Sequence, residues 1–166
     1  MGSLFLCEVC VFMIQRYEMK IGDGGKTAYR TMLAALKVAQ QDVQILHRYL
    51  ISDDFIANHE FLDSVYKEMA VWLDELAELG IALGIYEPNI DEALSVETPI
   101  RVEFRTLRET MDELIRICDF VYSDMERLKD TEIPSDVISK VEEYQLKLRV
   151  LAGYKAEQVL YGDFDR

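Results

Sequence analysis

Residues 55–80 read FIANHEFLDSVYKEMAVWLDELAELG, and this stretch decides the fold class of the chain. Its apolar residues recur at the alternating three- and four-residue spacing of a helix that buries one face. The stripe consists of Phe55, Leu62, Tyr66, Met69, Leu73, Leu76 and Gly80. The preceding Ser52, Asp53 and Asp54 offer three possible N-caps, and we expect the helix to end between Gly80 and Gly84.

Three further stretches carry the same periodicity, so the sequence predicts four amphipathic helices. They cover about residues 27–50, residues 100–128, and residues 137–151 after an opening Pro134. Strand-like alternation is absent apart from an ambiguous N-terminal segment, and no internal repeat appears. The expected fold is therefore an all-α four-helix bundle.

The connections between the helices favour one bundle topology. The first and third connections are short, which makes the helices that they join antiparallel neighbours. The second connection needs about fifteen residues and contains Pro88, a possible Asn89 cap and a short helical turn at Ile90–Leu94. One long crossover is the ferritin-like topology, whereas cytokine-type bundles use two and simple up-down bundles use none.

The length and composition predict one domain with a strongly acidic surface. The 166 residues suffice for a single core, and we expect the bundle over residues 27–162, an N-terminal arm at 1–26 and a short tail at 163–166. Lys and Arg number 18 against 31 Asp and Glu, which gives a net charge of −13. This charge repels phosphate backbones and attracts cations, so a metal ion is a better first candidate than nucleic acid.

The cysteines and the N-terminus indicate a cytoplasmic protein without a membrane anchor. Cys7, Cys10 and Cys118 are too few for a disulfide framework, which fits a reducing compartment. Cys7 and Cys10 form a C-x-x-C motif, but a metal or redox site would need a second ligand pair or a βαβ pattern. The apolar segment Leu4–Ile14 is too short to span a bilayer and lacks a basic region for export.

The only two histidines flank the turn between the first two helices. Because this turn folds the second helix back along the first, His47 and His59 can face each other as metal ligands. Asp63 lies one helical turn after His59, and Asp74 and Glu78 repeat the same four-residue spacing further along. The alternative is that these residues only form a solvated helix face and bind no metal.

The face and the separation of these carboxylates argue for a site shared between two chains. Asp63 and Asp74 lie within roughly 20° of each other around the helix, but roughly 16 Å apart along its axis. They cannot reach one metal ion. A two-fold axis between residues 68 and 69 would set Asp63 opposite the partner's Asp74 and His59 opposite the partner's Glu78. Each of two equivalent sites would then hold His47, His59 and Asp63 from one chain with Asp74 and Glu78 from the other. Such a set suits ferrous iron or manganese, with zinc as a competitor.

Read as H-x11-H-x3-D-x10-D-x3-E, these five residues resemble the ferroxidase signature of the Dps family at every spacing. The surrounding sequence over about residues 27–162 is similar too, including Thr98-Pro99-Ile100 before the third helix. The resemblance implies a homo-dodecameric shell of four-helix subunits built on isologous dimers. It further implies that Fe(II) is oxidised at two-fold interfaces, preferentially by hydrogen peroxide with dioxygen as the other oxidant, and is stored inside as ferric oxide.

Two departures from the family pattern concern the turn and the N-terminus. Arg48 follows His47 where the family usually has Trp, and Ser52-Asp53-Asp54 occupies the turn where a Gly is usual. The DNA-binding members mostly carry a Lys-rich tail, whereas residues 1–26 hold as many acidic as basic residues. Direct DNA binding is therefore not expected.

Two rival interpretations are a di-iron bundle with a site inside each subunit and a DNA-compacting bundle with little ferroxidase activity. The first uses Glu-x-x-His motifs, but Gln44 and Ile56 stand three residues before the two histidines. For the second, the five site residues would be incidental.

Acidic residues near the third connection are candidates for an iron-conducting pore. Cations that enter a shell need negative potential at a constriction, and Asp130 and Asp136 could supply it. The alternative for Asp136 is that it complements the dipole of the fourth helix.

Overall fold

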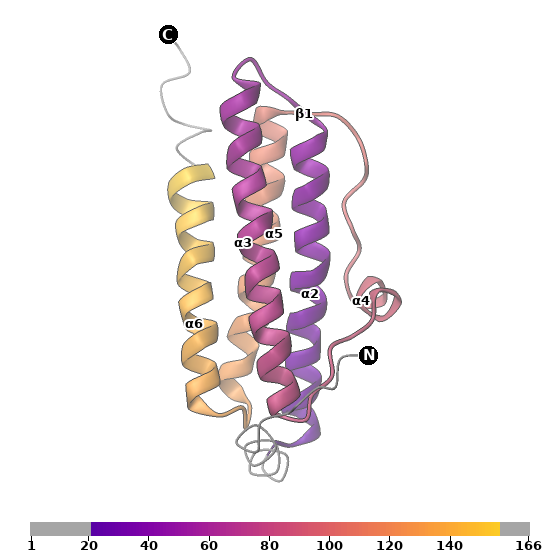
Figure 1. The fold of residues 1–166 in the computed structure, drawn as a ribbon, viewed down its shortest axis with the longest axis vertical. Coiled ribbons are helices and arrows are strands. Elements are labelled where there is room, and N and C mark those ends of the chain that lie inside the picture. The colour runs from indigo at the N-terminus through magenta and orange to yellow at the C-terminus, as the bar shows by residue number, and fades with distance from the viewer. Residues whose placement is uncertain (1–20, 157–166) are drawn as a thin grey trace, which may run out of the picture.

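The computed structural model describes residues 21–156, in which four long helices stand side by side (Figure 1). Two short elements lie in the connections between them, the helix α4 (Ile90–Val96) and the 3-10 turn η1 (Leu128–Asp130), and a π-helical stretch η2 (Val150–Ala156) follows the last long helix. The long helices are α2 (Asp23–Arg48), α3 (Phe55–Ala82), α5 (Leu107–Arg127) and α6 (Ser135–Arg149). The all-α four-helix bundle expected from the sequence is thus confirmed. Most of the predicted N-terminal arm, the Cys7–Cys10 motif and the C-terminal tail lie outside the described residues.

The apolar stripes of the four helices meet in one core. Leu62, Met69 and Leu76 of α3 are fully buried, as the periodicity predicted. Trp72 of α3 stacks on Tyr144 of α6 with ring centroids 5.3 Å apart, which packs these two helices together. None of the helices in residues 21–156 combines the length and the apolar character that a bilayer span requires.

The crossover between α3 and α5 occupies residues 83–106 and is longer than the expected fifteen or so. It carries α4 beside α2 (Figure 1). The predicted cap is confirmed, because the Asn89 side chain accepts the Glu92 N–H and the Glu92 carboxylate accepts the Asn89 N–H. Side chains of α2 hold the crossover along its length: Arg30 binds Glu92 at 2.9 Å, Lys37 binds Glu87 at 2.9 Å, and Asp42 accepts the Ile100 N–H at 3.1 Å.

The end of the crossover forms a small parallel β pair that the sequence did not predict. β1 (Leu50–Ile51) follows α2 after one residue, and β2 (Arg105–Thr106) directly precedes α5. Leu50 pairs with Arg105 and Ile51 with Thr106. The turn after α2 is thereby joined to the start of α5.

The sequence misplaced the start of two helices. α5 begins at Leu107 rather than near Ile100, because Thr106 and Glu109 form a capping box that starts the helix there. α2 begins at Asp23 rather than near Thr27, so two glycines lie within its first turn. A Cβ atom at Gly25 would lie 3.1 Å from the side chain of Ile21, which leaves little room for a larger residue.

The predicted cap of α3 is present in position only. Asp54 occupies the N-cap position, but its side chain makes no capping hydrogen bond. The Asn58 side chain instead donates to the Ser52 hydroxyl and to the Asp54 carbonyl, both at 2.9 Å. A side chain of the helix itself, that of Asn58, therefore stabilises the turn before α3 in place of the N-cap side chain.

Candidate metal centre

His47 and His59 meet at the turn between α2 and α3. His47 lies one residue before the end of α2, and the turn stacks its ring on that of His59 with centroids 3.6 Å apart and an interplanar angle of 29°. The Nδ1 atom of His59 lies 3.1 Å from the His47 carbonyl oxygen. In the tautomer that donates to this carbonyl, the His59 Nε2 lone pair is available to a metal ion.

Asp63 adds a carboxylate to the two imidazoles. Its Oδ1 atom lies 3.9 Å from His47 Nε2, a buried nitrogen with no hydrogen-bond partner. A buried nitrogen without a partner is costly unless a ligand satisfies it. Burial and the charge of His59 lower the His47 pKa, which favours the neutral ring that metals bind.

Three side chains next to this group were not anticipated. Lys67 lies one helical turn after Asp63, and its Nζ atom is 2.5 Å from Asp63 Oδ2. This hydrogen bond lowers the Asp63 pKa and favours the carboxylate. Phe55 stacks on His59 at 4.9 Å between centroids, and the Tyr66 ring lies 5.7 Å from that of His47. The four-residue spacing from Asp63 was the available signal for Lys67.

Asp74 and Glu78 do not join this group within one chain. Both are exposed on α3, and the eleven residues from Asp63 to Asp74 correspond to roughly 16 Å along a continuous helix. Glu78 instead borders a shallow depression between α3 and α6 together with Asp136 and Lys140. Over residues 21–156, no three His, Cys, Asp or Glu side chains are grouped closely enough to hold a metal ion.

Two of the exposed apolar residues of α3, Ile56 and Ile81, share the register of the predicted site residues. Ile56 is 72% exposed and Ile81 is 46% exposed. Their midpoint falls between residues 68 and 69, as do the midpoints of the pairs Asp63 with Asp74 and His59 with Glu78. Twenty-five residues separate the two isoleucines, which is within about 20° of seven full turns, so both lie on one face of α3.

The candidate pore acids lie at the junction of α5 and α6. Asp130 ends η1, Asp136 lies in the first turn of α6, and both are exposed. Their role in a pore stays a prediction.

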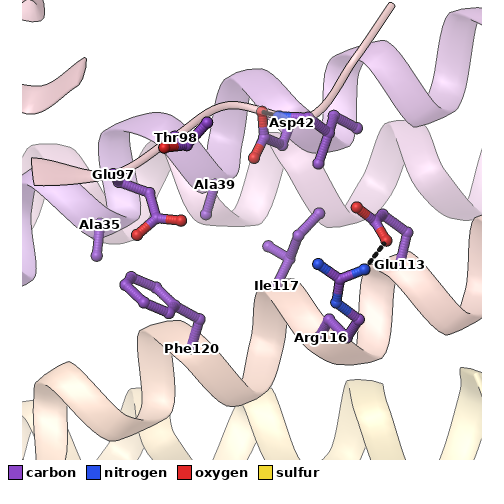
Figure 2. A pocket seen from close by; sticks show the side chains of 10 residues that line it. Ala35, Ala39, Asp42, Glu97, Thr98, Glu113, Arg116, Ile117 and Phe120 are labelled. Carbon is purple, nitrogen blue, oxygen red and sulfur yellow. Dashed lines mark hydrogen bonds and ion pairs between the residues drawn. The ribbon is translucent and has the colours of Figure 1, made fainter. Parts of the chain in front are cut away.

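A separate cavity of about 150 Å³ lies between α2, the crossover and α5 (Figure 2). Asp42 is 4% exposed and lines it, with Glu97, Glu113 and the ring of Phe120. Burial raises the pKa of Asp42 to about 6, against the opposing effect of the Ile100 hydrogen bond. Asp42 already anchors the crossover, and Glu113 is paired with Arg116 at 2.8 Å, so these acids have structural partners.

Comparisons of sequence give limited information about relatives. No family model matches the sequence. The fine tangled pili major subunit of Haemophilus ducreyi is 35% identical over 77 residues, which are 46% of this chain. The matched stretch spans 40% of the length of that protein.

Comparisons of structure are more extensive. A Dps protein from Deinococcus radiodurans superposes with a TM-score of 0.76 at 14% identity, over 86% of this chain and 88% of that one. Dps from Listeria innocua soaked with zinc gives 0.74 at 19% identity, over 82% and 95%. Dps from Staphylococcus aureus gives 0.74 at 16% identity, over 85% and 97%. The chain therefore has the ferritin-like four-helix-bundle fold of the Dps proteins.

Proposed function

We propose that this chain is a Dps-type mini-ferritin that oxidises Fe(II) at two-fold subunit interfaces and stores ferric oxide in a dodecameric shell. The observation that carries the proposal is the buried, unpartnered His47 Nε2 atom, which faces Asp63 beside the stacked His59 ring. The Dps fold supports it independently. The sparse cysteines fit a cytoplasmic location.

In the proposed site, each chain supplies half of the ligands. His47, His59 and Asp63 bind Fe(II) from one chain, and Asp74 and Glu78 of the partner subunit complete the set. Imidazole and carboxylate ligands suit ferrous iron, and manganese or zinc can compete for the same atoms. Two Fe(II) ions give one electron each to hydrogen peroxide, which takes up two protons and leaves as two water molecules.

The exposed apolar residues of α3 support the proposed dimer. A two-fold axis between residues 68 and 69 sets Ile56 opposite Ile81 of the partner subunit, and removes both side chains from water. The same axis assembles the two metal sites. The same two-fold axis thus pairs the two isoleucines and brings the metal ligands together, so one dimer interface accounts for both.

Two measurements test the proposal. Native mass should give a dodecamer, and an anaerobic Fe(II) titration followed by peroxide should give a ferric absorbance rise that saturates at a fixed ratio of iron to protein. Replacement of His59 by Ala should abolish the rapid phase. Glu60→Gln is the matched control, because Glu60 is exposed next to His59 but is outside the ligand set. A monomer, or equal rates for both variants, would contradict the proposal.

A further inference from the structure

The two oxygens of Asp63 face different neighbours. Oδ1 faces His47 Nε2 at 3.9 Å, whereas Oδ2 contacts the Lys67 ammonium at 2.5 Å. A carboxylate can serve two cations at once, one at each oxygen. Here one side opens toward the histidine pair, and the other side is already occupied by a positive charge of the same chain.

Lys67 also lies where the two half-sites would meet. Seven residues separate it from Asp74, which places both within about 20° of each other on the exposed face of α3. With the two-fold axis between residues 68 and 69, Asp63 lies opposite the partner subunit's Asp74. The Lys67 side chain is 64% exposed, so its ammonium can reach the space between these carboxylates.

We propose that Lys67 is a built-in cation that competes with divalent metal for Asp63, so that each interfacial site binds one metal ion tightly and a second only when Lys67 is displaced. This inference rests on the proposed function, because it assumes the shared site. The first ion binds on the histidine side, where no cation stands. A second ion near Oδ2 must break the ion pair and overcome the repulsion of an ammonium a few ångströms away.

Cobalt(II) titration of the assembled full-length protein tests this inference without any redox step. Isothermal calorimetry and visible absorption should show two binding events per site in the wild-type protein, a tight one and a weak one. Lys67→Gln removes the competing charge and should tighten the second event by up to about fivefold. Lys67→Arg keeps a cation near Asp63 and should leave the second event weak.

The matched control is Lys129→Gln, which removes the same charge from ion pairs with Glu126 and Glu142 outside α3. It should leave both events unchanged. If wild-type protein binds cobalt and Lys67→Gln binds it with the same two affinities, Lys67 is not a competitor, while the proposed metal site stands. If wild-type protein binds no cobalt, the proposed function fails and the inference fails with it.

Discussion

Subunit mixing provides the most demanding test of a shared site. Asp63 and Asp74 lie roughly 16 Å apart along α3, whereas one metal ion would need both oxygens within about 2 to 2.5 Å. Asp63→Ala and Asp74→Ala assemblies should therefore each oxidise Fe(II) slowly, since every site lacks one carboxylate. In a mixed dimer, the intact Asp63 of one chain meets the intact Asp74 of the other, so one of its two sites is complete.

The expected recovery follows from counting sites. Random association of the two variants at equal amounts makes about half of all dimers mixed, so about a quarter of all sites are complete. Co-expressed variants with different tags, purified through both tags, should oxidise Fe(II) with about a quarter of the wild-type amplitude or more.

The structure offers a matched control for this experiment. His59 and Asp63 belong to the same half-site, so a mixture of His59→Ala with Asp63→Ala leaves every site broken. That mixture should show no recovery. If native mass verifies co-assembly and the Asp63→Ala and Asp74→Ala mixture stays inactive, or if both mixtures recover equally, the shared-site model is wrong.

Further predictions concern stability, uptake and nucleic acid. Because the Asp42 pKa is raised to about 6, its contribution to stability is present below about pH 4 and is lost as the pH rises through 6. In urea denaturation, Asp42→Asn should therefore raise the free energy of unfolding by up to about 3 kcal/mol over wild type at pH 7.5, but by little at pH 4. A difference between variant and wild type that does not change with pH would contradict this. Thr106→Ala removes the cap of α5 and should cost about 1 kcal/mol in the same assay, whereas Thr106→Ser should cost little. Joint Asp130→Asn and Asp136→Asn substitution should slow iron uptake into the proposed shell without slowing oxidation of the first iron equivalents. Unchanged uptake would remove the pore assignment. Gel-shift assays in chelator at physiological salt should show no tight duplex DNA binding, because the chain's net charge of −13 repels the phosphate backbone.

The sequence predicted the helices best where one signal decided their position. α3 has a single apolar stripe and a clear stop, and its bounds at Phe55 and Ala82 follow the prediction. At the start of α5 two signals disagree: the apolar spacing continues back to Ile100, but the capping box at Thr106 begins the helix later. A local hydrogen bond to the backbone is more specific than periodicity, so the cap decides.

The candidate site was predictable only in part for a related reason. His47, His59 and Asp63 could be grouped because a short turn reverses the chain between them. The Lys67 ion pair depends on which of several exposed neighbours a carboxylate selects, and the stacking of Phe55 depends on the path of the turn. The β1–β2 pair joins residues more than fifty positions apart, and no local pattern in four residues can reveal such a contact.

That β pair has a mechanical consequence for the histidines. Leu50 follows His47 by three residues, and the Tyr49 carbonyl between them accepts the Arg105 N–H at 3.0 Å. Thr106 is at once the last residue of β2 and the cap of α5. Hydrogen bonds thus connect the end of α2, which carries His47, to the end of the crossover and the start of α5. A change in the length of the crossover would therefore displace the end of α2 and shift the His47 ring.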